Sequence, residues 1–170
     1  MNSVLQSVCD AYAEALADRS SEWCQMHPQQ DEAAWSAQDL IEHLVLAMSS
    51  TRQLLEARLE RGRATRRRAT PIQYLCRVAV LSLRRMPRGV NAPPFTVPGQ
   101  TRWPSLSGAE LAERLRRECE QMDQLLGACL QRFGKQRVAA HFLLGPLSAA
   151  EWRRFHSIHG RHPAISRRPH

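Results

Sequence analysis

Residues 107–134 read SGAELAERLRRECEQMDQLLGACLQRFG, and this stretch contains a whole helix together with both of its ends. Ser107 and Glu110 have the spacing of a capping box, in which each side chain accepts a hydrogen bond from the other residue's backbone N–H. Gly134 is typical of the residue that ends a helix. Between these ends the apolar residues recur every three or four positions: Leu111, Leu115, Cys119, Met122, Leu126, Cys129 and Phe133. The stretch predicts a long amphipathic helix that packs against other helices.

The same kind of helix start recurs along the chain. The further predicted caps are Ser36 with Asp39, Ser148 with Glu151, and Thr70 before Pro71. The N-terminal residues carry one more apolar stripe, formed by Leu5, Val8, Tyr12 and Leu16. These signals predict five helices, and no segment alternates with a period of two for long enough to predict a sheet. We therefore expect an all-α fold, a helix bundle in which residues 1–170 form one domain.

Two connections join these helices. Residues 19–35 link the first helix to the second without a helical stripe. Residues 86–106 contain five prolines and predict a long extended connection that crosses the bundle. Because Phe95 and Trp103 give this second connection apolar side chains to bury, we expect it to be ordered.

Composition limits the classes of protein that the chain can belong to. No apolar run reaches the roughly 18 residues of a membrane span, and the N-terminus lacks the basic start of a signal peptide. We therefore expect a cytoplasmic protein with no membrane partner. The five cysteines are scattered and never paired as Cys-x-x-Cys, so they are interpreted as small buried apolar side chains.

The formal net charge of +8 is concentrated in one part of the chain. Between residues 52 and 88 there are eleven arginines and two glutamates. Such a basic surface can attract an anionic ligand. The run RGRATRRRAT has no interleaved aromatic side chains that could stack on bases, so we expect a solvated loop and no specific nucleic-acid partner.

Two histidines lie on the apolar faces of different predicted helices. His43 lies beside Leu40 in the second helix, and His159 lies one turn after Phe155 in the last. A lone histidine on such a face is usually a core residue, but two that face the same core can share an ion. A third imidazole one turn from His159 would complete a set of nitrogen donors suited to zinc or nickel.

Three segments resemble one known family. WSAQDLIEHL at residues 35–44, RGVNAPP at residues 88–94 and above all HFLLGPLSAAEWRRFHSIHGRH at residues 141–162 are similar to the DinB/YfiT-like superfamily. The resemblance extends over about residues 1–162. It implies a four-helix bundle of the up-down-down-up type, with an extra short helix and the long Pro-rich connection. It also implies a three-histidine metal centre, with one ligand from the second helix and two from the last.

The resemblance assigns roles to individual histidines. It makes His43 the ligand from the second helix and His159 the first ligand of the last helix, while His141 holds the turn before that helix. Where the family has its next ligand, four residues after His159, this chain has Pro163, which offers no donor atom and opposes helix continuation. Residues 163–170 are therefore an atypical C-terminal tail, produced by divergence or by a change of reading frame.

Three outcomes stay open for the third ligand. His162 rebuilds the site from three residues beyond His159, His156 substitutes from the other side, or the metal is weakly held or absent.

The resemblance implies an enzyme that depends on a divalent metal ion, zinc or nickel, and acts as a hydrolase or thiol transferase on an unidentified small molecule. The alternative is a non-catalytic helical bundle without bound metal that serves as an interaction or dimerisation module, for example as a homodimer.

Overall fold

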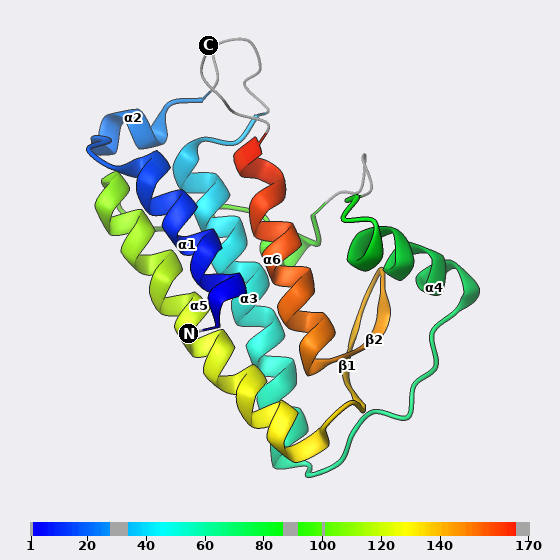
Figure 1. The fold of residues 1–170 in the computed structure, drawn as a ribbon. Helices are drawn as coiled ribbons and strands as arrows, with labels where there is room; N and C mark the ends of the chain where they lie inside the picture. Colours follow the sequence, from blue (N-terminus) through cyan, green and yellow to red (C-terminus); the bar gives the residue numbers. More distant parts are fainter. Residues whose placement is uncertain (1, 28–33, 87–91, 100, 166–170) are drawn as a thin grey trace.

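The structure is a computed structural model that describes the chain except for residues 1, 28–33, 87–91, 100 and 166–170, and except for the side chains of residues 3 and 162–165. The four long helices are α1 (Ser3–Leu16), α3 (Ala37–Glu60), α5 (Gly108–Phe133) and α6 (Ala149–Ile165). They lie side by side, with α1 and α6 running in one direction and α3 and α5 in the other (Figure 1). The described residues are mostly helical, as the sequence predicts.

The predicted caps start the helices as expected. Ser36 and Asp39 at α3 and Ser107 and Glu110 at α5 form complete capping boxes. Ser148 and Glu151 make the same reciprocal hydrogen bonds before α6. At its other end α5 stops at Gly134, whose φ of 58° is accessible to glycine with little strain.

The apolar stripes form one core between the four helices. All seven stripe residues of α5 are buried, and so are the four predicted core residues of α1. Four of the five cysteines are buried and Cys76 is half-buried, which agrees with their interpretation as small apolar side chains. The hydroxyl of Tyr12 in α1 donates to the carbonyl oxygen of Gly160 in α6 at 2.9 Å, so these two helices are joined by a polar contact as well.

The expectation that no sheet is present is wrong. Strands β1 (Arg137–His141) and β2 (Gly145–Ser148) form an antiparallel hairpin between α5 and α6. The strands are too short for a visible alternation, and a register irregularity between Arg137 and Ala139 interrupts their period of two. The first connection also differs from the prediction, because it contains the short helix α2 (Ser21–Gln25), capped by Ser20.

The extra short helix begins at Pro71 behind its Thr70 cap, as predicted. It consists of α4 (Pro71–Arg77) and continues into a π-helical turn, η1 (Val78–Ser82). With the β1–β2 hairpin it lies on one flank of the four long helices and leans away from α1 and α5 (Figure 1).

In the long connection, the described residues form a single 3-10 turn, η2 (Pro94–Thr96), which is followed by a bend and a turn at residues 97–99. Residues 87–91 and 100 of the predicted connection lie outside the described residues.

Pro163 does not end the last helix. The backbone of α6 continues to Ile165, which corrects the expectation that the proline stops it. A proline this close to a helix end removes only one of the last hydrogen bonds of the helix. None of the described helices is both long and apolar enough to cross a membrane.

Candidate metal centre

The structure brings His43 of α3 and His159 of α6 together. Their Nε2 atoms lie 3.2 Å apart, and their ring centroids are separated by 5.1 Å with the planes nearly perpendicular. The two helices run in opposite directions here, so a residue near the start of α3 meets a residue near the end of α6 (Figure 1).

The second ring nitrogen of His43 is fixed by the Pro-rich connection. His43 Nδ1 lies 2.8 Å from the carbonyl oxygen of Thr96 in η2. Because a carbonyl oxygen can only accept, Nδ1 must carry the proton, and in the neutral ring Nε2 then carries the lone pair. That lone pair faces His159, which is the tautomer and orientation a metal-binding histidine needs.

Two buried polar side chains of α3 hold the connection in this position. The Glu42 carboxylate accepts hydrogen bonds from the backbone N–H of Gly99, from the backbone N–H of Thr101 and from the Thr101 hydroxyl, at 2.5–3.1 Å. One turn earlier, Gln38 accepts from the N–H of Leu106 at 3.0 Å and donates to the Pro104 carbonyl at 3.1 Å. Glu42 therefore does not bind His43 directly but anchors the segment that does.

Aromatic side chains form the walls around the pair. The ring of Trp35 lies against His43, with centroids 4.7 Å apart, and Phe155 stacks on His159 at 5.4 Å. His43 is buried and His159 is half-buried. Burial lowers the pKa of His43 below its ordinary value of 6.5, and the hydrogen bond to the Thr96 carbonyl offsets part of that effect. His43 thus stays neutral, the form in which imidazole binds metals.

The separation of the two nitrogens fits joint coordination of one ion. Two nitrogens that each lie about 2.1 Å from an ion, about 100° apart, are about 3.2 Å from each other. The distance between His43 Nε2 and His159 Nε2 has that value. The donors are also of the kind that zinc and nickel accept.

The described residues supply two nitrogens but no complete ligand set. No three histidine, cysteine, aspartate or glutamate side chains gather closely enough to hold a metal ion within the part of the chain that the structure describes. The predicted ligand His162 has its side chain outside that part. His156 is fully buried, and its Nε2 lies 3.2 Å from the Thr51 hydroxyl. His156 does not group with the pair, which disfavours it as the substitute ligand.

His141 lies in the hairpin, and its ring packs against Phe155, with centroids 4.5 Å apart. Its Nδ1 accepts from the backbone N–H groups of Leu143 and Leu144, at 3.1 and 3.3 Å, and so holds the turn between β1 and β2. Burial lowers its pKa from 6.5 to about 4. These contacts agree with the structural role that the resemblance gave it.

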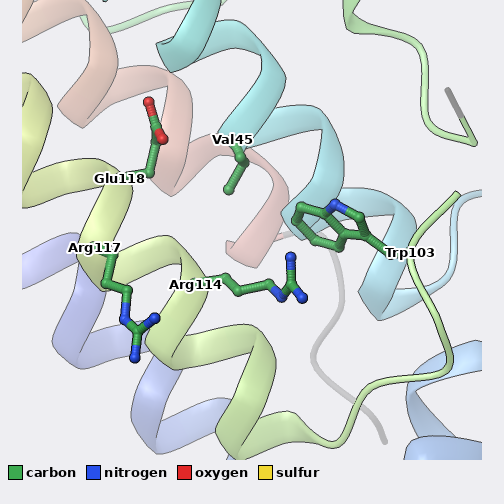
Figure 2. A pocket seen from close by; sticks show the side chains of 5 residues that line it. All are labelled: Val45, Trp103, Arg114, Arg117 and Glu118. Atoms are coloured by element: carbon green, nitrogen blue, oxygen red, sulfur yellow. The ribbon is translucent and has the colours of Figure 1, made fainter. Parts of the chain in front are cut away.

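A separate hollow of about 320 Å³ lies between α3, α5 and the end of the connection. Figure 2 shows the side chains that line it, which are Val45, Trp103, Arg114, Arg117 and Glu118. The Arg114 guanidinium lies over the Trp103 ring, 4.7 Å from its centroid. Glu118 pairs with Arg52 at 3.2 Å, and burial raises the pKa of this carboxyl. No predicted ligand lines this hollow.

Sequence reasoning missed Thr96, Gln38 and Thr101 as parts of the site. Thr96 contributes a backbone carbonyl, which every residue type has, so no residue pattern could have identified it. Gln38 gave a weak signal as a polar residue that falls among the buried positions of α3.

Comparison of the chain with protein-family models, with curated proteins and with solved structures gave no match.

Proposed function

We propose that the chain is a DinB/YfiT-like four-helix bundle in which His43 and His159 bind a divalent metal ion, and that it acts as a metal-dependent hydrolase or thiol transferase. The observation that carries this proposal is the 3.2 Å separation of the two Nε2 atoms, together with the Thr96 carbonyl that sets the His43 tautomer. The directions of the four long helices support the up-down-down-up bundle type (Figure 1).

A divalent ion held by His43 and His159 would supply a nucleophile near neutral pH, because it would lower the pKa of a water or thiol bound to it. Residues of the chain itself orient His43 and shield the two histidines from water. The Thr96 carbonyl keeps the proton of His43 on Nδ1, and Trp35 and Phe155 exclude water from two sides of the pair. The buried Glu42 carboxylate keeps the connection, and with it Thr96, against α3.

One observation favours a second function, that of a non-catalytic bundle. The same two Nε2 atoms are close enough for a direct hydrogen bond, in which His159 Nε2–H donates to the lone pair of His43. In that case the pair joins α3 to α6 without an ion, and the protein serves as an interaction or dimerisation module.

Metal analysis of the full chain, purified without a histidine tag, distinguishes the two functions. We expect about one zinc or nickel ion per wild-type chain and at least about a tenfold loss of affinity in His43→Ala and His159→Ala. The matched control is His27→Ala, which removes an exposed histidine whose Nδ1 lies 2.9 Å from the carbonyl oxygen of the nearby Ala34. Equal and substoichiometric metal in the wild type and in all variants would favour the non-catalytic bundle.

A second substitution tests the interpretation that Pro163 weakens the metal site by replacing a ligand. The resemblance places a ligand at position 163, so Pro163→His should raise both the metal content and the thermal stability gained on adding zinc. Unchanged metal content in this variant would contradict that interpretation while leaving the two-histidine site to be judged by the first experiment.

A further inference from the structure

The short helix on the flank exposes an unusual amount of apolar surface. Ile72, Leu75 and Leu83 are 72%, 67% and 64% exposed, although such side chains are normally buried. We call the surface that they form with their neighbours the α4 face; its members are Ile72, Tyr74, Leu75, Val78, Leu83 and, from the hairpin turn, Phe142. Adjoining exposed apolar residues of this kind mark a contact surface.

The α4 face is free because the opposite side of the same helix attaches it to the protein. Val80 and Leu81 are buried in the core. Arg77 Nη1 donates to the Pro146 carbonyl at 3.2 Å, and Gln73 Nε2 donates to the Phe142 carbonyl at 3.1 Å. These contacts attach the inner side of the helix to the rest of the protein. The exposed side chains of Ile72, Leu75 and Leu83 take no part in these contacts.

The segments that carry the α4 face contain basic residues but no acidic ones. None of the sixteen acidic residues of the chain lies within residues 61–109 or 134–150, the segments that include α4, η1, the connection and the hairpin. Residues 61–109 contain ten arginines. Exposed arginines stand at both ends of the helix: Arg66, Arg67 and Arg68 before it, and Arg84 and Arg85 after it.

We propose that the α4 face docks on the surface of an anionic lipid bilayer. Aliphatic side chains such as Ile72 and Leu75 enter the boundary of the acyl chains, while arginines at both ends of the helix contact lipid phosphates. A protein that lies on a membrane surface needs no spanning helix. The proposal therefore replaces the expectation that the chain has no membrane partner, which was based on the lack of a spanning segment. It is independent of the metal centre.

The observations favour lipid over other occupants. A second copy of the chain placed on this face would bring two acid-free, arginine-rich segments together, and like charges in contact repel. A nucleic acid would use the arginines and the exposed rings of Tyr74 and Phe142, since its bases stack on aromatic side chains, but it would leave the aliphatic side chains of Ile72, Leu75 and Leu83 without a partner.

Vesicle flotation with the full chain tests the proposal. The probes are vesicles of phosphatidylcholine alone and vesicles in which about one third of the lipid is phosphatidylglycerol. We expect the wild type to float with the second kind only, and to be released as sodium chloride rises from about 0.05 to about 0.5 M. Ile72→Ser with Leu75→Ser should weaken binding about tenfold or more. Arg66→Gln with Arg67→Gln and Arg68→Gln should weaken it roughly a hundredfold.

The matched control is Leu54→Ser with Leu130→Ser, which changes two exposed leucines on α3 and α5. This variant should bind like the wild type, and circular dichroism melts should show that all variants are folded. Failure of the wild type to bind anionic vesicles overturns the proposal, as does an equal loss in the control. Two further results also overturn it: a dimer that the Ile72 and Leu75 substitutions dissociate, or binding of an oligonucleotide that those substitutions weaken.

Discussion

Glu42 is the single residue on which the geometry of the candidate site depends most. Only 3% of Glu42 is exposed, although the residue carries a carboxylate. Burial of a charge is costly unless hydrogen bonds compensate for it, and three donors from Gly99 and Thr101 provide that compensation. The carboxylate thereby fixes the part of the connection that carries Thr96.

We predict that Glu42→Ala lowers the free energy of unfolding by about 3 kcal/mol, because it leaves two backbone N–H groups without their charged acceptor. Glu42→Gln should cost less, since the amide oxygen can still accept. Urea denaturation measures both changes. Glu56→Ala, which removes an exposed carboxylate from the same helix, is the control and should change stability by less than about 0.5 kcal/mol. Equal effects at positions 42 and 56 would show that the connection does not depend on the carboxylate.

The sequence predicted the two imidazoles of the site but not what orients them. His43 and His159 stood out because a residue type and a helical face can be read from a sequence. The Thr96 carbonyl could not stand out, since its position depends on how residues 92–99 lie against α3. The prediction of a metal at these histidines stays a prediction, and the side chain of His162 lies outside the described residues.

Among the helices, α5 begins in direct contact with the end of α1. The backbone N–H of Gly108 donates to the Arg19 carbonyl at 2.9 Å. A β-carbon at position 108 would lie 2.0 Å from the carbonyl oxygen of Leu16. Because that oxygen belongs to the backbone, it cannot rotate away, so only a residue without a side chain allows the two helix ends to meet.

Two glycine substitutions in the same helix should have opposite effects. Gly108→Ala should lower the free energy of unfolding by about 2 kcal/mol or more, because the two helix ends must separate. Gly127→Ala meets no atom within 4 Å and should raise it by up to about 1 kcal/mol through helix propensity. Thermal unfolding followed by circular dichroism compares them. Similar melting temperatures for the two variants would mean that α1 and α5 are not in contact at position 108.

Helices could be predicted here more fully than strands. The two residues of a capping box identify the residue at which a helix starts. The boxes at Ser36, Ser107 and Ser148 each mark a helix start in the structure. The hairpin had no comparable signal, because its strands have five and four residues and one irregular pair. Whether a short segment forms a strand depends on what it packs against more than on its local sequence pattern.

For the molecule as a whole, acid sensitivity follows from three imidazoles on three different elements, two of them buried (His43 and His156) and one half-buried (His141). Burial is the largest cause that lowers the pKa of His43 in α3, of His141 in β1 and of His156 in α6. Unfolding exposes these rings and returns their pKa to the ordinary value of 6.5. Between that value and the lower folded value, protons bind the unfolded chain more strongly, so stability is complete above pH 6.5 and falls as the pH decreases.

His141 offers the cleanest test, with a folded pKa of about 4. We expect stability to fall by about 3 kcal/mol between pH 6.5 and pH 4 on account of this residue. His141→Asn keeps an acceptor for the N–H groups of Leu143 and Leu144 but does not titrate, so the decline should be smaller in this variant. Urea denaturation at a series of pH values measures the slope, with His27→Asn as the exposed control. Identical slopes for His141→Asn and the wild type would contradict the prediction.

The attachment of the connection to α3 through Glu42 and Gln38 has a kinetic consequence. This segment has one 3-10 turn of its own and relies on a few hydrogen bonds, so it can detach at a lower free energy than the helices can unfold. In that opened form the helical core persists while the His43 tautomer is no longer set. Hydrogen–deuterium exchange should therefore find the amides of Gly99 and Thr101 exchanging well before those of the α5 core, and a ligand that requires the closed segment should slow their exchange.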